Sequence, residues 1–190
     1  MRKGTVCLWD YLRLLVSLLL LPAFGQAGQT ATYPQEAVKA AFLHRFAAYV
    51  EWPSPPPSGA AFVIGIYHAD AVAQQLALLL PGLSIQEHPA EVRKVVRAAD
   101  LTGVQVLYVG SGALGAARQL LAASANHQIL VVTDDEKGLA RGGVINFIRE
   151  ERSVRFEVSL PAAERNGLKI QAGLLSVAAR VEGDPKAEIR

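Results

Sequence analysis

A glycine-rich stretch, Gly110-Ser-Gly112-Ala-Leu-Gly115, has the spacing with which many nucleotide-binding loops hold a pyrophosphate. Glycines let the backbone of such a loop approach the phosphates, and the helix that follows presents free N–H groups to them. We expect no cofactor here, because the stretch does not belong to the first strand–helix unit of the chain and small residues are common throughout. A tight turn and a helix cap explain the same glycines.

Polar side chains also follow three apolar segments that we predict to be parallel strands. These side chains are His68 with Asp70, Ser111, and Asp134 with Asp135. In an open sheet the ligand crevice lies outside the carboxyl ends of the strands, so His68, Ser111 and Asp134 are candidates for binding a small polar ligand. We favour the alternative that Asp70 and Ser111 cap helices and that Asp134-Asp135 forms a solvated turn.

The other reactive side chains have no spacing that predicts catalysis or metal binding. No two histidines are two or four residues apart, which is the spacing that would bring two imidazoles to one metal ion; they are His44, His68, His88 and His127. The sequence has no Gly-x-Ser-x-Gly motif, and its paired carboxylates are adjacent and therefore point apart on extended backbone. We predict that the chain is not an enzyme and holds no metal ion.

Helices and strands that alternate along the chain must position these residues. We predict helices over residues 33–52, 70–80 and 113–125, buried strands over 62–67, 104–109 and 129–133, a short peripheral strand near 90–93, and a closing amphipathic segment over 169–181. Such alternation requires crossover connections. The predicted fold is therefore α/β, with a mixed, largely parallel central sheet and helices on both faces in three α/β/α layers.

Residues 141–159 predict an antiparallel hairpin at the C-terminal side of this sheet. Residues 144–148 are apolar except for Asn146, which predicts a strand covered on both faces, whereas residues 154–159 alternate between apolar and polar. The turn between them, residues 149–152, is fully charged. A buried amide needs partners, and we favour bonds from Asn146 to neighbouring loop backbone over contact with a ligand.

The first 27 residues have the features of a cleaved export signal. Arg2, Lys3 and Arg13 are basic, residues 14–21 are apolar, and Gly25-Gln26-Ala27 supplies small residues for cleavage. The apolar run has about half the length that a membrane-spanning helix needs. We predict a signal peptide over residues 1–27, cleavage near Ala27, and a single exported domain over residues 28–190.

The composition of that domain excludes two further classes of function. The only cysteine, Cys7, is removed with the signal peptide, so the mature chain has no disulfide and no thiolate nucleophile. The signal peptide also takes three of the 19 basic residues and one of the 17 acidic residues, which leaves 16 of each. A neutral domain without a basic tract has no electrostatic reason to bind nucleic acid.

Several stretches together resemble the YfiR family of exported bacterial proteins. They are Val38-Lys-Ala-Ala-Phe-Leu-His-Arg-Phe-Ala-Ala-Tyr-Val-Glu-Trp-Pro53, Phe62-Val-Ile-Gly-Ile66, Arg141-Gly-Gly-Val-Ile-Asn-Phe147 with Val154-Arg-Phe-Glu-Val158, and Gly167-Leu-Lys-Ile170 with Leu174-Leu175. The helix ending in Glu-Trp-Pro, combined with the Gly-Gly-x-Ile-Asn-Phe hairpin, is the most specific part of this resemblance.

The resemblance implies a periplasmic, non-enzymatic, homodimeric regulator. It would bind the periplasmic domain of a membrane-anchored diguanylate cyclase of the YfiN type, or of a sensor kinase, and so lower cyclic-di-GMP signalling and biofilm formation. Many relatives carry redox-sensitive disulfides, but this chain is apolar near residues 104–106, where a cysteine is frequent. Redox control by a disulfide is therefore not expected.

The resemblance and the crevice give two sets of candidate binding residues. The family-like motifs contain seven of them: Arg141, Asn146, Arg155, Glu157, Lys169, His44 and Arg45. For each of these side chains we favour a salt bridge or a cap over contact with a partner. The alternative function is a periplasmic protein that binds a small ligand in the crevice at His68, Ser111 and Asp134.

Overall fold

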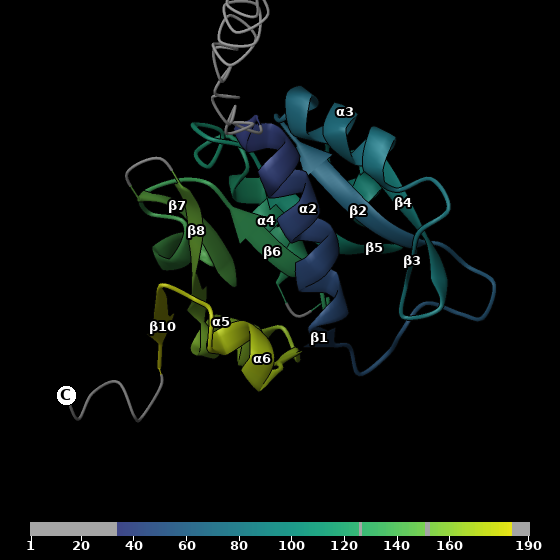
Figure 1. Cartoon of the computed structure of the whole chain (residues 1–190). Coiled ribbons are helices and arrows are strands. Elements are labelled where there is room, and N and C mark those ends of the chain that lie inside the picture. Colours follow the sequence, from purple (N-terminus) through teal and green to yellow (C-terminus); the bar gives the residue numbers. More distant parts are fainter. Residues whose placement is uncertain (1–33, 126, 151–152, 184–190) are drawn as a thin grey trace, which may run out of the picture. The chain divides into compact units, whose positions relative to one another are not determined.

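An eight-stranded sheet forms the centre of the fold (Figure 1). The computed structural model describes residues 34–125, 127–150 and 153–183, and the predicted signal peptide lies outside these residues. The strands of the sheet are β2 (Phe62–Tyr67), β3 (Ser84–Ile85), β4 (His88–Lys94), β5 (Val104–Val109), β6 (Leu130–Thr133), β7 (Ile145–Glu150), β8 (Ser153–Ser159) and β10 (Arg180–Glu182). Their spatial order is β10-β8-β7-β6-β5-β2-β4-β3.

The sheet is mixed and largely parallel, as predicted. Strands β4, β2, β5, β6 and β7 all run in the same direction. Strand β8 is antiparallel to β7, which confirms the predicted hairpin, and β10 then runs parallel to β8. The short strand β3 pairs antiparallel with β4 at the other edge.

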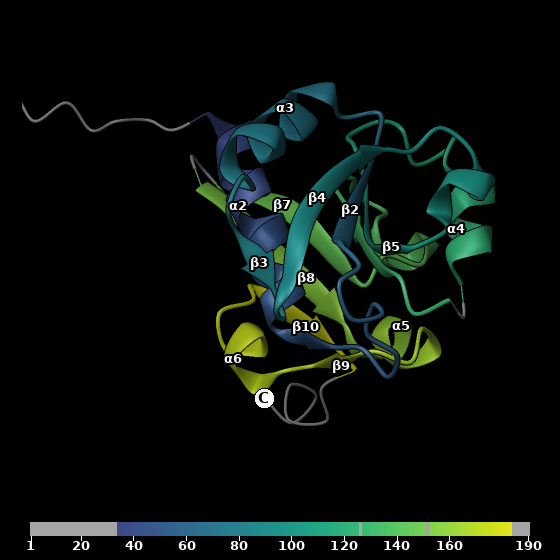
Figure 2. The ribbon, with the colours of Figure 1, turned by 90° about the vertical axis from the view of Figure 1, so that its right-hand side faces the viewer.

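Separate hydrophobic cores lie on the two faces of the sheet, because successive residues of a strand point to opposite sides. The helices that cover it are α2 (Gln35–Ala48), α3 (Asp70–Leu79) and α4 (Arg118–Ser124). Ile64 and Tyr108 pack in the core beneath α2 and α3. Leu107 packs with Leu120 of α4 on the opposite face. Figure 2 shows α4 across the sheet from α2 and α3, which confirms the predicted three-layer arrangement.

Aromatic rings fix α2 on the hairpin side of the sheet. The ring of Phe46 lies 4.8 Å from that of Phe156 and 5.6 Å from that of Phe147, measured between centroids. Phe42 stacks against Phe46 at 5.5 Å. The orientation of α2 is therefore set by a cluster that joins it to both strands of the hairpin.

Two predicted helix boundaries and one predicted helix cap were wrong. The first helix ends at Ala48 rather than at residue 52, because Val50–Glu51 (β1) pairs with Lys169–Ile170 (β9) in a separate two-stranded sheet. The helix predicted over 113–125 begins only at Arg118. Asp70 does not cap α3 through its side chain; it bonds instead to Lys94 of β4 at 2.9 Å.

The C-terminal part of the chain differs most from the prediction. Residues 169–181 are not one amphipathic segment but contain β9, a short helix α6 (Ala172–Leu175), and β10. Before them lies the unpredicted helix α5 (Leu160–Arg165), whose first turn is capped by the Ser159 hydroxyl, which accepts a hydrogen bond from Ala162 N. Two 3-10 turns, η1 (Ala98–Leu101) and η2 (Leu139–Arg141), complete the fold.

The expected polar face of β8 is buried at its C-terminal half. Glu157 is 7% exposed and Ser159 is 3% exposed, because β10 lies beside this half of the strand and α5 follows it. The alternating pattern of residues 154–159 therefore indicated a strand correctly, although its last polar residues are buried. Among the described residues, no helix combines the length and the apolar character that crossing a membrane requires.

Candidate functional site

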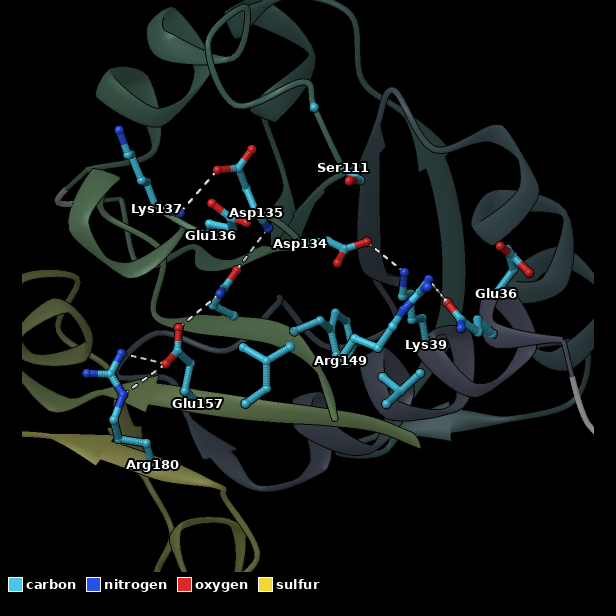
Figure 3. A pocket seen from close by; sticks show the side chains of 16 residues that line it. Glu36, Lys39, Ser111, Asp134, Asp135, Glu136, Lys137, Arg149, Glu157 and Arg180 are labelled. Atoms are coloured by element: carbon cyan, nitrogen blue, oxygen red, sulfur yellow. Dashed lines mark hydrogen bonds and ion pairs between the residues drawn. The ribbon is translucent and has the colours of Figure 1, made fainter. Parts of the chain in front are cut away.

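A polar cleft of about 1110 Å³ opens where β5 and β6 end, between the start of α2 and the β7–β8 hairpin. Figure 3 shows charged side chains from α2, from the loop after β6 and from the hairpin around it, together with Ser111 from the loop after β5. The residues that line it are Gln35, Glu36, Lys39, Ser111, Gly112, Asp134, Asp135, Glu136, Lys137, Asn146, Phe147, Ile148, Arg149, Val154, Glu157 and Arg180. The cleft lies at the carboxyl ends of parallel strands, where open α/β sheets bind their ligands.

One wall of the cleft is held by a shielded ion pair between α2 and the end of β6. Lys39 lies seven residues, or about two turns, before Phe46 on the same face of α2, so the aromatic cluster that fixes Phe46 also fixes Lys39. The Lys39 Nζ lies 2.6 Å from Asp134 Oδ2, and the two side chains are only 13% and 20% exposed. The pair ties the first helix to the sheet at this point.

Tyr108 of β5 supports this ion pair from below. Its hydroxyl donates a hydrogen bond of 3.3 Å to Asp134 Oδ2. Burial, and then the charge of Asp134, raise the pKa of the Tyr108 hydroxyl far above its ordinary value. Tyr108 therefore stays protonated and acts as a fixed donor rather than as an acid or base.

The floor of the cleft is a chain of hydrogen bonds across four neighbouring strands, centred on Asn146. Its Oδ1 accepts from Thr133 Oγ1 at 2.7 Å and from Asp135 N at 3.2 Å, and its Nδ2 donates to Glu157 Oε1 at 2.9 Å. Arg180 closes the chain, because its Nε and Nη2 donate to Glu157 Oε2 at 3.0 and 2.5 Å. The backbone of Asp135 is one partner of Asn146, as predicted, but two side chains are also partners.

Two glycines allow the loop after β6 to fold against this network. A Cβ atom on Gly138 would overlap Asn146 Oδ1 and Thr133 Oγ1, and one on Gly143 would lie 2.8 Å from Thr133 Oγ1. Thr133 and Asn146 are 0% and 1% exposed, so neither can move aside into solvent. The glycines are required by the close approach of backbone to this buried pair.

The structure brings together four of the ten residues that the sequence singled out. Ser111, Asp134, Asn146 and Glu157 all line the polar cleft, and they come from different segments of the chain. The neighbouring residues Lys39, Arg149 and Arg180 carried no sequence signal of their own. Their place in the cleft depends on how α2, β7 and β10 pack together.

The other six candidates lie elsewhere. His68 follows β2, is exposed, and lies beside Tyr67 with 4.4 Å between the tilted rings' centroids, outside the cleft. Arg155 pairs with Glu150 at 3.5 Å. The remaining four are distributed over α2, η2 and β9: His44, Arg45, Arg141 and Lys169.

Of these four, two on α2 have distinctive surroundings. Arg45 borders a small apolar cavity of about 230 Å³ between α2 and α6. His44 has its Nε2 enclosed without a hydrogen-bond partner in the part of the chain that the structure describes. Neither side chain reaches the polar cleft.

The glycine-rich stretch after β5 is explained by packing between two loops. Gly110 N donates to Tyr67 O at 2.9 Å, and a Cβ on Gly110 would overlap His68 O. Gly112 has a φ of +74°, which a residue with a side chain rarely adopts. Since α4 begins eight residues after Gly110, the stretch does not lead directly into a helix N-terminus.

The described residues contain no group of three or more histidine, cysteine, aspartate or glutamate side chains placed to hold a metal ion. The charged groups on the cleft floor are instead bonded to one another. The arrangement presents a shaped, polar surface with fixed charges of both signs.

A family model described as YfiR/HmsC-like (DUF4154) matches residues 36–179. Among solved structures, a crystal structure of a conserved domain protein from Vibrio cholerae is similar to the chain, with a TM-score of 0.48 and 15% sequence identity. The similarity covers 77% of this chain and 60% of the length of that one. No curated protein matches the sequence.

Proposed function

Because the chain belongs to the YfiR/HmsC-like family, we propose that it is a periplasmic regulatory protein of cyclic-di-GMP signalling. It binds the periplasmic part of a membrane-bound diguanylate cyclase, or of a related membrane sensor, and represses it. The family match over residues 36–179 is the observation that carries this proposal. The predicted signal peptide, cleaved near Ala27, would deliver the protein to the compartment where such a domain is exposed.

The geometry of the cleft supports a role in binding. Lys39 pairs with Asp134, and Asn146 donates to Glu157, so each of these side chains is positioned by its partner. Catalytic acids and bases need a polar atom directed at the substrate. Groups that fix each other in place instead build a rigid recognition surface.

Deletion of the gene and measurement of cyclic-di-GMP tests the proposal. Cells without the protein should contain more cyclic-di-GMP, and a plasmid copy should restore the original level. A second plasmid copy that lacks residues 1–27 should not restore it, because that protein would remain in the cytosol. An unchanged cyclic-di-GMP level in the deletion strain, with every membrane cyclase present, would contradict the proposal.

The position of the cleft at the carboxyl ends of parallel strands supports a second candidate function, the binding of a small periplasmic ligand. The cleft holds about 1110 Å³ and brings Ser111, Asp134 and Asn146 together. A ligand at a hundred times its dissociation constant stabilises the fold by about 2.7 kcal/mol. Thermal-shift screening of the mature protein with nucleotides, amino acids and sugars measures this effect, and the absence of any shift would leave the second function without support.

A further inference from the structure

Strand β7 is paired along its whole length on one side only. Strand β8 lies opposite every residue from Ile145 to Glu150. On the other side, β6 pairs only with Ile145 and Asn146. The remaining residues of β7, 147–150, extend past the end of β6, and no other strand of the described chain lies beside them.

This unpaired edge of β7 borders the polar cleft. Phe147, Ile148 and Arg149 all line the cleft, together with Asp134 from the end of β6. Figure 3 shows Arg149 between the side of the cleft with Lys39 and Asp134 and the side with Glu157 and Arg180. A polypeptide that entered the cleft would therefore meet the edge of β7 in the middle of the cleft.

The register of the hairpin determines which backbone groups are free. Glu150 and Ser153 are opposite each other and are joined by only two residues, so this pair is bonded across the hairpin. In an antiparallel ladder the next residue directs its groups the other way. The backbone N–H and C=O of Arg149 therefore point away from β8, toward the side on which β6 has ended.

The walls of the cleft fit an extended polypeptide better than a compact small molecule. Small-molecule pockets are mostly apolar and enclose their ligand, whereas this cleft is wide and carries charges of both signs. Lys39 and Arg180 are held in place by carboxylates, and Arg149 donates to the neutral Gln35 Oε1 at 2.7 Å. Fixed charges on both sides of a free strand edge select a segment with complementary charges.

We infer that the edge of β7 at residues 147–150 receives an extended, charged segment of the membrane partner as an additional β-strand. This inference rests on the proposed function, and it assigns the surface and the kind of contact by which the partner is held. The backbone of the segment bonds to Arg149, and its side chains meet the charged walls of the cleft. The charges at the hairpin end keep the same edge from pairing with unrelated strands.

Two substitutions at one position separate the backbone contribution from that of the side chain. Arg149→Ala removes the guanidinium and keeps the N–H, whereas Arg149→Pro removes both and leaves the hairpin bonds intact, since proline is tolerated on a free edge. Binding of labelled mature protein is measured on spheroplasts of the deletion strain, which expose the periplasmic face of the membrane. The proline variant should bind at least about tenfold more weakly than the alanine variant.

The control is Glu91→Ala on the exposed surface of β4, which should bind like the natural protein. Melting temperatures of all variants are measured in parallel. Equal binding by folded proline and alanine variants would overturn the inference, because the N–H of Arg149 would then have no partner.

Crosslinking tests the same surface even where the proline variant fails to fold. The predicted mature chain has no cysteine, so Arg149→Cys and Glu91→Cys each carry a single thiol. With a photoreactive thiol reagent on spheroplasts, position 149 should form an adduct with an integral membrane protein and position 91 should not. The captured protein must be the one whose cyclase output rises in the deletion strain.

Other adducts would overturn the inference. A product of two copies of this chain would assign the edge to a homodimer, and an internal link to residues 28–33 would assign it to the start of the mature chain itself. A failure of position 149 to crosslink, alongside a normal rise of cyclic-di-GMP on deletion, would refute this docking surface and leave the proposed function standing. An unchanged cyclic-di-GMP level would refute the function itself.

Discussion

Replacing Asn146 with aspartate changes one buried donor into an acceptor and leaves the shape of the side chain unaltered. The Nδ2 of Asn146 lies 2.9 Å from Glu157 Oε1. In the Asn146→Asp variant, a carboxylate oxygen takes the place of that nitrogen and faces the carboxylate of Glu157. Two carboxylates at this distance cannot both be ionised, so the folded Asn146→Asp variant must hold one proton that residues 146 and 157 share.

The stability cost follows from the pH at which that proton is held. An aspartate in the unfolded chain has a pKa of about 3.9, and keeping it protonated costs about 1.36 kcal/mol for each pH unit above that value. The variant should therefore lose about 4 kcal/mol of unfolding free energy at pH 7. Its native state binds more protons than its unfolded state, so this loss should shrink as the pH falls and nearly vanish at about pH 4.

Urea unfolding of the mature protein between about pH 4 and 7.5 measures the difference between variant and natural protein. Adding Glu157→Gln to Asn146→Asp restores a donor opposite an acceptor, with the roles exchanged, and should recover much of the stability. A loss below about 1 kcal/mol at pH 7 that does not change with pH would refute the placement of Asn146 beside Glu157.

Three further predictions concern the same cleft. Gly138→Ala places a methyl group against Asn146 Oδ1 and should lower the free energy of unfolding by about 1 to 3 kcal/mol, measured by urea unfolding. Lys39→Met leaves Asp134 without its cation and should cost about 1 to 3 kcal/mol at pH 7. Because its pKa is raised, the Tyr108 hydroxyl should not ionise in the folded protein near the ordinary tyrosine pKa of 10.0, and phenolate absorbance measures this. The unfolded chain does ionise there, so the free energy of unfolding should fall as the pH rises past 10.0, as urea unfolding at alkaline pH would measure.

Each of these predictions has a matched control. Gly115→Ala meets nothing nearer than 4.0 Å and should be neutral, and equal losses at the two glycines would contradict the packing argument. Adding Asp134→Asn to Lys39→Met removes both charges and should cost less than the two single changes combined. In Tyr108→Phe, the number of tyrosines that ionise in the folded protein should stay the same; a decrease by one would mean that Tyr108 is accessible.

The sequence predicted the parallel part of the sheet well, because each buried strand is continuously apolar. Phe62–Tyr67 is buried at all six positions and Val104–Val109 at five of its six. The C-terminal part was predicted poorly, since β9, α6 and β10 are only two to four residues long. Elements of that length have no periodicity of their own, and they form because strands elsewhere in the chain offer them partners.

Only part of the cleft was predictable for a related reason. Ser111 and Asp134 follow apolar strands, and the rule for carboxyl ends of parallel strands places them together. Arg180 lies near the end of the described chain and reaches Glu157 only because β10 returns parallel to β8. Lys39 reaches Asp134 only because the aromatic cluster fixes the direction of α2.

The class of fold, the hairpin and the burial of Asn146 could be predicted from the sequence because each follows from a local apolar pattern. The export signal was predicted from local basic, apolar and small residues. The tertiary structure decided which charges meet, how far β7 extends past β6, and that this extension borders the cleft. Those features depend on contacts between residues as far apart as 114 positions, from Gln35 to Arg149. No pattern in a short window of sequence can specify such contacts, since they arise only when the sheet has assembled.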